Sequence, residues 1–224
     1  DVPAAPPILA ALKEKTWSLT HILLTHHHDD HVAGLADVLA AHPAQVIGAA
    51  ADQHRLPSLN RAVFAGDTLA IGSQLGRVMD VPGHTVGHIA VYFEGAKLLF
   101  SADSLMALGC GRLFEGTAEQ MWQSLDIMRN LPADTLVCSG HEYTLANAKF
   151  AITIEPQNRD LIKRHADTIA ANQQGKPTVP SRLSLERATN PFLRPESPEI
   201  RERLQMPSAS NAKVFAEIRR LKDK

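Results

Sequence analysis

The sequence predicts an α/β fold followed by a helical subdomain, and three observations support this prediction. An apolar strand, a polar loop, a helix and a second strand follow one another early in the chain, an order that produces parallel strand pairs. Several short strands separated by glycines come next. After Tyr143 the strand signals stop and helical periodicity remains. We therefore place a boundary near residue 145, between an α/β domain (1–145) and a helical subdomain (146–224).

The composition is that of an ordinary folded protein. Hydrophobic residues make up 44% and charged residues 21% of the 224 residues, so neither disorder nor a membrane protein is indicated. The net charge of -1 argues against a broad basic face for nucleic acid. Two cysteines cannot form a disulfide framework, which fits a reducing compartment. We expect a cytoplasmic monomer that binds neither nucleic acid nor a membrane.

The first elements alternate between helix and strand. A helix is predicted from about Pro7 to Lys15, and the apolar, β-branched run 19–25 predicts a buried strand. Apolar residues at helical spacing then predict one helix that begins near Asp30 and continues through Leu39, before a strand at 45–49. The polar loop between the first strand and the second helix therefore lies at a strand end, where α/β folds place their chemistry.

The middle of the chain changes to short strands. Glycines interrupt the apolar runs, and the predicted strands are 68–71, 74–81, 88–93 and 97–101. Thr117 and Gln120 form a capping box that predicts the start of a helix. A further buried strand is predicted at 135–138. Beyond it, apolar periodicity predicts three helices, at 145–154, 159–173 and 212–221.

The segment Thr25-His26-His27-His28-Asp29-Asp30-His31 carries the functional prediction. In an extended chain, side chains alternate, so His26 and His28 project to one side and bind one cation. As the chain turns into the helix, Asp30 and His31 offer a carboxylate and an imidazole to a second cation. Nitrogen and oxygen ligands suit zinc, iron or manganese better than calcium.

A solvated loop or a histidine tag is the alternative interpretation of this segment. Tags are terminal and uniform, whereas this run is internal, contains Asp and lies between a strand and a helix. His27 and Asp29 occupy the alternate positions, so we expect them to point away from the cations.

Later loops supply the remaining candidate ligands. They are His84 or His88 in Pro82–His88, Asp103 after the strand 97–101, and His141 after the strand 135–138. Any one of them alone would be a weak prediction. Their appearance at successive strand ends is a stronger indication of a metal centre with two cations.

These residues resemble a known family, glyoxalase II, the hydroxyacylglutathione hydrolases of the metallo-β-lactamase superfamily. The first two matching motifs are typical of the superfamily and several of the others are closer to glyoxalase II itself. The motifs are Thr25–His31, Pro82–His88, Gly109–Thr117, Gly140–Thr144, Asn190–Arg194 and Arg219–Asp223. The resemblance implies an αββα metallo-β-lactamase sandwich with a C-terminal helical subdomain. The family begins with several strands that precede the position of Asp1, so we expect these strands to be missing from the sequence or to come from another segment.

The resemblance also implies a ligand set. His26, His28 and His84 would bind the first metal, Asp30, His31 and His141 the second, and Asp103 both. By the same match His88 is not a ligand. Substrate recognition would involve Arg112, Tyr143, Arg219 and Lys222, whose cationic groups suit the anionic glutathione. Some members of the family have Tyr where Phe114 stands, which removes one hydroxyl from the expected contacts.

The function implied by the resemblance is a thioesterase that hydrolyses S-(2-hydroxyacyl)glutathione. S-D-lactoylglutathione would give glutathione and D-lactate, the second step of methylglyoxal detoxification. A hydroxide shared by two divalent ions, zinc in the first instance and iron or manganese as alternatives, would attack the thioester carbonyl, with Asp30 and Asp103 assisting. Alternatives are a lactonase, a β-lactamase or a persulfide dioxygenase of the same superfamily, or a non-catalytic metal-binding module. The helical tail and the motif 140–143 argue against the other enzymes.

Overall fold

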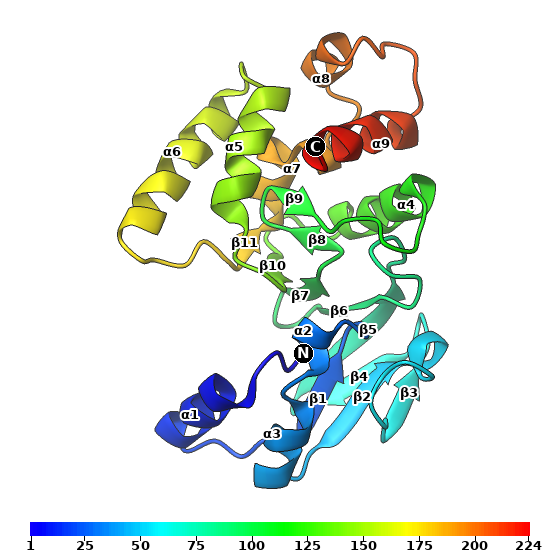
Figure 1. Ribbon diagram of the computed structural model, residues 1–224, viewed down its shortest axis with the longest axis vertical. Coiled ribbons are helices and arrows are strands. Elements are labelled where there is room, and N and C mark those ends of the chain that lie inside the picture. The colour runs from blue at the N-terminus through cyan, green and yellow to red at the C-terminus, as the bar shows by residue number, and fades with distance from the viewer.

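The computed structural model describes residues 1–224 and shows two β-sheets with helices on their outer sides (Figure 1). One sheet has three parallel strands, in the order β1 (His21–Leu24), β2 (Gln45–Ala49) and β3 (Arg61–Val63). The other has six strands, in the order β11 (Ser181–Arg182), β10 (Leu136–Ser139), β7 (Leu98–Ala102), β6 (Ile89–Phe93), β5 (Gln74–Asp80) and β4 (Thr68–Ile71). A separate hairpin consists of β8 (Leu105–Met106) and β9 (Gly109–Cys110).

The helices fall into two groups along the chain. Those of the first 142 residues are α1 (Ala5–Lys15), α2 (Asp29–Val32), α3 (Leu35–Ala41), the 3₁₀ turn η1 (Ala50–Asp52) and α4 (Ala118–Arg129). Those of the rest are α5 (Thr144–Ile154), α6 (Arg159–Gln173), α7 (Leu183–Thr189), the 3₁₀ turn η2 (Pro191–Leu193), α8 (Pro198–Arg203) and α9 (Asn211–Lys222). This second group gathers at one end of the molecule in Figure 1. None of these helices combines the length and the apolar character that crossing a membrane requires.

Alternating side chains on the three-stranded sheet separate two layers of packing. Ile22, Leu24 and Val46 are buried in a cluster with residues of α1 and α3 on one face. Ile47 and Ala49 are buried on the other face, in a cluster with the second sheet. This alternation follows from the period of two along a strand.

The six-stranded sheet shows the same alternation. Val78 and Val91 belong to the cluster between the sheets. Their neighbours Met79, Ala90 and Tyr92 are buried on the opposite face, in the largest cluster, which includes side chains of α4 and α9. Helices, sheet, sheet and helices therefore form four layers, which is the αββα sandwich that the family resemblance implied.

Several predicted elements are confirmed. The predicted strand 45–49 and the predicted helix 159–173 coincide with β2 and α6. The capping box is also present, since Gln120 N donates to Thr117 Oγ1 over 3.2 Å and Thr117 N donates to Gln120 Oε1 over 2.8 Å. This reciprocal pairing satisfies two backbone donors that a helix start leaves free.

The prediction of one helix through Leu39 is wrong, because the chain forms α2 and α3 with a break at Ala33–Gly34. Gly34 N donates to Val2 O over 2.9 Å. A Cβ on Gly34 would lie 2.7 Å from the backbone of Ala4 and Ala5. The break therefore lets the start of the chain pass directly over the end of the predicted metal-binding segment, 26–31.

The expectation that strands stop after Tyr143 is also wrong. Ser181 and Arg182 form β11, which pairs antiparallel with β10 at Val137 and Leu136. A strand of two residues is too short to show a periodic pattern, so β11 could not be predicted from periodicity. The helical part of the chain thus contributes the outer strand of the larger sheet.

Candidate metal centre and substrate pocket

Three imidazoles converge at the ends of β1 and β5. His26, His28 and His84 each offer one nitrogen, and these atoms lie within 4.8 Å of one another. His84 Nε2 is 3.0 Å from His28 Nδ1. His26 Nε2 is buried and has no hydrogen-bond partner. A buried nitrogen without a partner is costly unless something else, such as a cation, accepts its lone pair.

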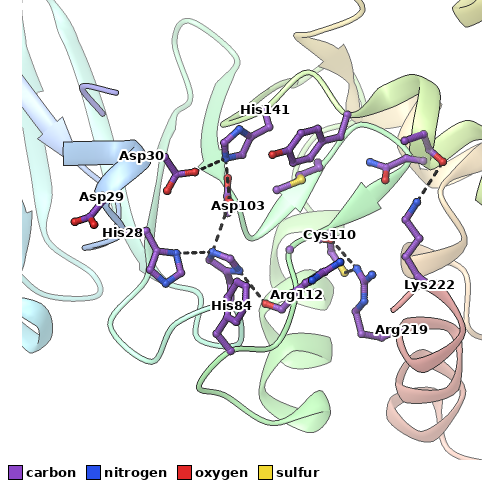
Figure 2. Close-up of a pocket in the computed structure, with 16 residues that line it drawn as sticks. His28, Asp29, Asp30, His84, Asp103, Cys110, Arg112, His141, Arg219 and Lys222 are labelled. Atoms are coloured by element: carbon purple, nitrogen blue, oxygen red, sulfur yellow. Dashed lines mark hydrogen bonds and ion pairs between the residues drawn. The ribbon is translucent and has the colours of Figure 1, made fainter. Parts of the chain in front are cut away.

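A second group forms beside the first. Asp30 and His31 lie on α2, and His141 follows β10, and their ligand atoms also lie within 4.8 Å of one another. His141 Nε2 is 3.3 Å from Asp30 Oδ2 and 3.3 Å from His31 Nε2. Figure 2 shows Asp30 and His141 directed toward the same point above Asp103.

Asp103 lies between the two groups. Its Oδ2 is 3.5 Å from His84 Nε2 and 3.4 Å from His141 Nε2, and its Oδ1 is 3.5 Å from His31 Nε2. The side chain is buried, and Oδ1 makes no hydrogen bond. The seven expected ligands therefore come together, with Asp103 within reach of both groups.

The protonation states favour cation binding. Burial lowers the pKa of His26, His28 and His84, and the surrounding imidazoles lower the pKa of His26 further. Burial alone would raise the pKa of Asp103, but the nearby imidazoles of His31, His141 and His84 lower it. Neutral imidazoles and an ionised carboxylate are the forms that bind divalent metals. The donor set thus fits divalent metal ions.

Two glycines allow the backbone to approach these ligands closely. A Cβ on Gly140 would lie 2.4 Å from Asp103 Oδ1, and one on Gly111 would lie 2.8 Å from His84 Nδ1. Any other residue at either position would therefore displace a candidate ligand. The sequence pattern predicted His141 but not the requirement for glycine immediately before it.

The ring nitrogens that face away from the centre also have partners. His84 Nδ1 lies 2.8 Å from Arg112 O, and His26 Nδ1 lies 3.0 Å from Thr25 Oγ1. His31 Nδ1 lies 2.8 Å from Asp1 Oδ2. Such partners fix the tautomer and the orientation of metal-binding imidazoles. Asp1 had no signal in the sequence, because its contact with His31 depends on packing over 30 positions.

His88 occupies a different place from His84. Its ring stacks on His26 with the centroids 4.6 Å apart, and its Nδ1 is 3.0 Å from Ile89 O. Burial lowers the pKa of His88 to about 3, so the ring is neutral. His88 belongs to neither group of converging ligand atoms. His27 and Asp29, the residues expected to point away, also lie outside both groups, and Figure 2 shows Asp29 apart from the converging side chains.

A cavity of about 680 Å³ opens onto the centre. It has the size of a typical small-molecule site. Its floor and walls contain both candidate metal ligands and candidate substrate residues (Figure 2). Among the lining residues are His28, Asp30, His84, Asp103, His141, Arg112, Tyr143, Arg219 and Lys222.

Tyr143 and Lys222 line the cavity and have few contacts with other side chains. The exposed Tyr143 ring stacks on His141 with the centroids 4.7 Å apart. Lys222 Nζ donates to Ala146 O over 3.2 Å and lies 5.1 Å from the ring centroid of Phe150. Burial and the nearby Arg219 lower the pKa of Lys222. Both side chains line the cavity between the candidate metal centre and α9.

The two arginines differ in their surroundings. Arg219 is buried, and it donates to Cys110 O over 2.9 Å and to the carboxylate of Asp223 over 2.9 and 3.2 Å. Arg112 is exposed, and its Nε lies 3.5 Å from Asp223 Oδ1. The guanidinium of Arg219 is therefore held within the wall by hydrogen bonds, whereas that of Arg112 is exposed and has only a surface ion pair with Asp223.

Comparisons with known proteins match both parts of the chain. The family model described as "Metallo-beta-lactamase superfamily" matches residues 2–141, and that described as "Hydroxyacylglutathione hydrolase C-terminus" matches residues 142–224. Among solved structures, a B3 metallo-β-lactamase named BLEG-1 has a TM-score of 0.63 at 21% identity, covering 84% of this chain and 83% of its own. ETHE1 from Myxococcus xanthus has a TM-score of 0.60 at 23% identity, with 94% and 79% covered. These structures share the metallo-β-lactamase fold.

Curated relatives are much more similar in sequence. A hydroxyacylglutathione hydrolase from Cereibacter sphaeroides is 60% identical over 223 residues, covering all of this chain and 88% of the relative. One from Roseobacter denitrificans is 59% identical with the same coverage, and one from Methylococcus capsulatus is 55% identical and 87% covered. With this identity over its whole length, and both family models matched in order, the chain belongs to the hydroxyacylglutathione hydrolase family.

Proposed function

We propose that this protein is a thioesterase that hydrolyses S-(2-hydroxyacyl)glutathione, and S-D-lactoylglutathione in particular, to glutathione and a 2-hydroxy acid such as D-lactate. This is the second step of methylglyoxal detoxification. One observation carries the proposal: a single cavity joins the two groups of metal-ligand atoms to a wall of aromatic and cationic side chains. The relatives described above are named hydroxyacylglutathione hydrolase, which is this activity.

We assign two divalent ions to this site, zinc in the first instance. His26, His28 and His84 would hold one ion, Asp30, His31 and His141 the other, and Asp103 would contact both. The same nitrogen and oxygen donors also accept iron or manganese. When bound, such ions lower the pKa of water from about 15.7 toward 7 and polarise a carbonyl oxygen.

Two carboxylates of the chain can accept the proton that the attacking water loses. Asp103 is buried among imidazoles and stays ionised, and Asp30 is exposed beside His141. The carboxylates of both residues are therefore available at the centre of the pocket. Either carboxylate accepts the proton of the attacking water. The leaving thiolate needs no strong acid, because a thiol has a pKa of only about 8.5.

The helical part, residues 146–224, is the substrate-binding subdomain in this proposal. Glutathione carries carboxylates, and guanidinium and ammonium groups are their natural partners. Arg112 and Lys222 would meet these carboxylates, and Tyr143 would contact the peptide beside His141. Arg219 would stabilise the wall through its hydrogen bonds to Cys110 O and Asp223. Its positive charge would also attract the carboxylates of the ligand.

A thioester assay with measured metal content tests the proposal. The protein loaded with zinc should cleave S-D-lactoylglutathione faster than a lactone or a β-lactam. Asp103→Ala should lose bound metal and activity together, and its retention of both ions would contradict the shared role of Asp103. Two bound ions without turnover of any glutathione thioester would favour a non-catalytic metal-binding module.

We also propose that the protein acts as a cytoplasmic monomer. Cys110 and Cys138 are both free, which fits a reducing compartment. Light scattering of the purified protein measures its mass in solution, and a dimer would contradict this part of the proposal.

A further inference from the structure

A ring of polar side chains lies behind the first group of metal ligands and has no part in the scheme above. We name it the brace, and it consists of His27, Asp52, Arg55 and Glu115. His27 Nδ1 lies 2.8 Å from Asp52 Oδ2, and Arg55 Nε donates to Asp52 Oδ1 over 2.6 Å. Arg55 also forms a two-pronged ion pair with Glu115. Glu115 Oε1 lies 3.6 Å from His27 Nε2, which closes the ring.

The brace ties together the three backbone segments that surround the first group. His27 lies between the candidate ligands His26 and His28. Glu115 Oε2 accepts a hydrogen bond from Val86 N over 2.8 Å, two residues after His84.

The loop after β9 contacts the same assembly through three residues, Arg112, Phe114 and Glu115. Glu115 belongs to this loop, and so does Arg112, whose carbonyl oxygen lies 2.8 Å from His84 Nδ1. Phe114 places its ring 5.5 Å from that of His28 and 5.3 Å from that of His84. Movement of any one of the three segments would therefore strain the contacts of the others.

Asp52 is the centre of the brace. Its side chain is completely buried, so its charge depends on the hydrogen bonds from His27 and Arg55. A Cβ on Gly87 would lie 2.6 Å from Asp52 Cβ, so the loop that carries His84 packs directly against this carboxylate. Loss of the charge would loosen both that loop and the segment 26–28.

The orientation of His27 explains how the brace acts on its neighbours. In the extended chain at the end of β1, His27 points to the side opposite His26 and His28. Because the imidazole of His27 is hydrogen-bonded to Asp52, the end of β1 cannot rotate easily about the strand axis. Since rotation would move both ligands together, holding His27 fixes the direction of each.

We infer that the brace positions His26, His28 and His84 for one metal ion and leaves the second group unaffected. The second group has its own support, because His31 Nδ1 contacts Asp1 and His141 stacks on Tyr143. The brace residues are positioning residues, since none of them offers an atom to either ion. The inference rests on the metal-binding function proposed above.

Zinc binding to the apoprotein tests this inference in Asp52→Asn, with a chromophoric chelator as the competitor. One zinc ion should bind about 10- to 100-fold more weakly than in the unchanged protein, the usual effect of losing a partner behind a metal ligand. The other should bind with unchanged affinity. Asp134→Asn is the matched control, because Asp134 makes an exposed ion pair with Lys97 and should leave both affinities unchanged.

Hydrogen exchange of the zinc-loaded protein gives a second measurement. Asp52→Asn should increase exchange in the segments 25–28 and 84–88 and leave 139–143 unchanged. If Asp52→Asn does not fold, Glu115→Gln removes a partly exposed member of the brace and should show the same selective weakening. Two unchanged affinities, or two affinities weakened equally, would overturn the inference. Failure of the unchanged protein to bind zinc would refute the proposed metal centre instead.

Discussion

Replacing Glu186 with Gln should destabilise the protein strongly, although Glu186 lies outside the pocket. Its carboxylate is completely buried and forms an ion pair with Arg164, which is also buried. Glu186 further accepts hydrogen bonds from Ser181 Oγ over 2.6 Å, Leu108 N over 2.9 Å and Asn190 Nδ2 over 3.2 Å. One carboxylate thus joins α6, α7 and β11 to the turn of the β8–β9 hairpin.

The magnitude follows from the unpaired charge that the substitution leaves. Removing one partner of a buried ion pair costs about 3 to 5 kcal/mol, because the other charge stays buried without compensation. For a chain of this size, each kcal/mol lowers Tm by about 2 to 4 °C, so Tm should fall by about 6 to 20 °C. Adding Arg164→Met removes the second charge and should recover part of the loss.

Denaturant unfolding with saturating zinc measures these free energies. Asp167→Asn is the control, since Asp167 pairs with Lys163 on the exposed side of the same α6 and should change stability little. A loss below about 1 kcal/mol in Glu186→Gln would refute the argument. A double variant with Arg164→Met that is less stable than Glu186→Gln alone would also refute it.

Three further predictions concern the pocket, the brace and the cysteines. Lys222→Ala should raise KM for the glutathione thioester about 10- to 100-fold with little change in kcat, the effect of losing one charged hydrogen bond, and an unchanged KM in steady-state assays would remove Lys222 from the binding wall. The hydrogen bond from Arg55 lowers the pKa of Glu115 from 4.5 to about 2, so ionised Glu115 stabilises the fold fully above pH 4.5 and no longer does so as the pH falls toward 2. Between pH 4.5 and 2, Glu115→Gln should therefore lose less stability than the unchanged protein in acid titrations. Equal losses in the two proteins would contradict the ion pair between Arg55 and Glu115. Burial raises the pKa of Cys110 to about 11, so iodoacetamide at pH 8 should modify the partly exposed Cys138 first, and mass spectrometry showing equal labelling would be inconsistent with this burial.

The sequence predicted the longer elements well because several signals coincide in them. The helix α6 has Asn158 as an N-cap, with Asn158 Oδ1 accepting from Leu161 N over 3.1 Å, and apolar residues at helical spacing. The strands β8, β9 and β11 contain two residues each and depend on partners far along the chain. No periodic pattern exists over two residues, so these strands were missed.

In the candidate site too, local patterns predicted some residues, whereas others depend on tertiary packing. Four of its seven expected ligands lie in the segment 26–31, where the period of two along a strand already separates His26 and His28 from His27. Asp103 and His141 could be predicted as candidates because they follow predicted strands. The carboxylates behind the ligands, Asp1 and Asp52, were missed, because only tertiary packing brings them to His31 and His27.

The pairing of β11 with β10 limits how the helical part of this protein, residues 146–224, can be exchanged with that of a relative. A chimera in which everything after residue 145 comes from a relative would also replace β11, the edge strand of the larger sheet. This strand pairs with β10, which leads into His141. Exchanging substrate preference by grafting would therefore disturb the candidate metal ligand His141 at the same time. A graft that retains the native segment 178–186 should separate the two effects.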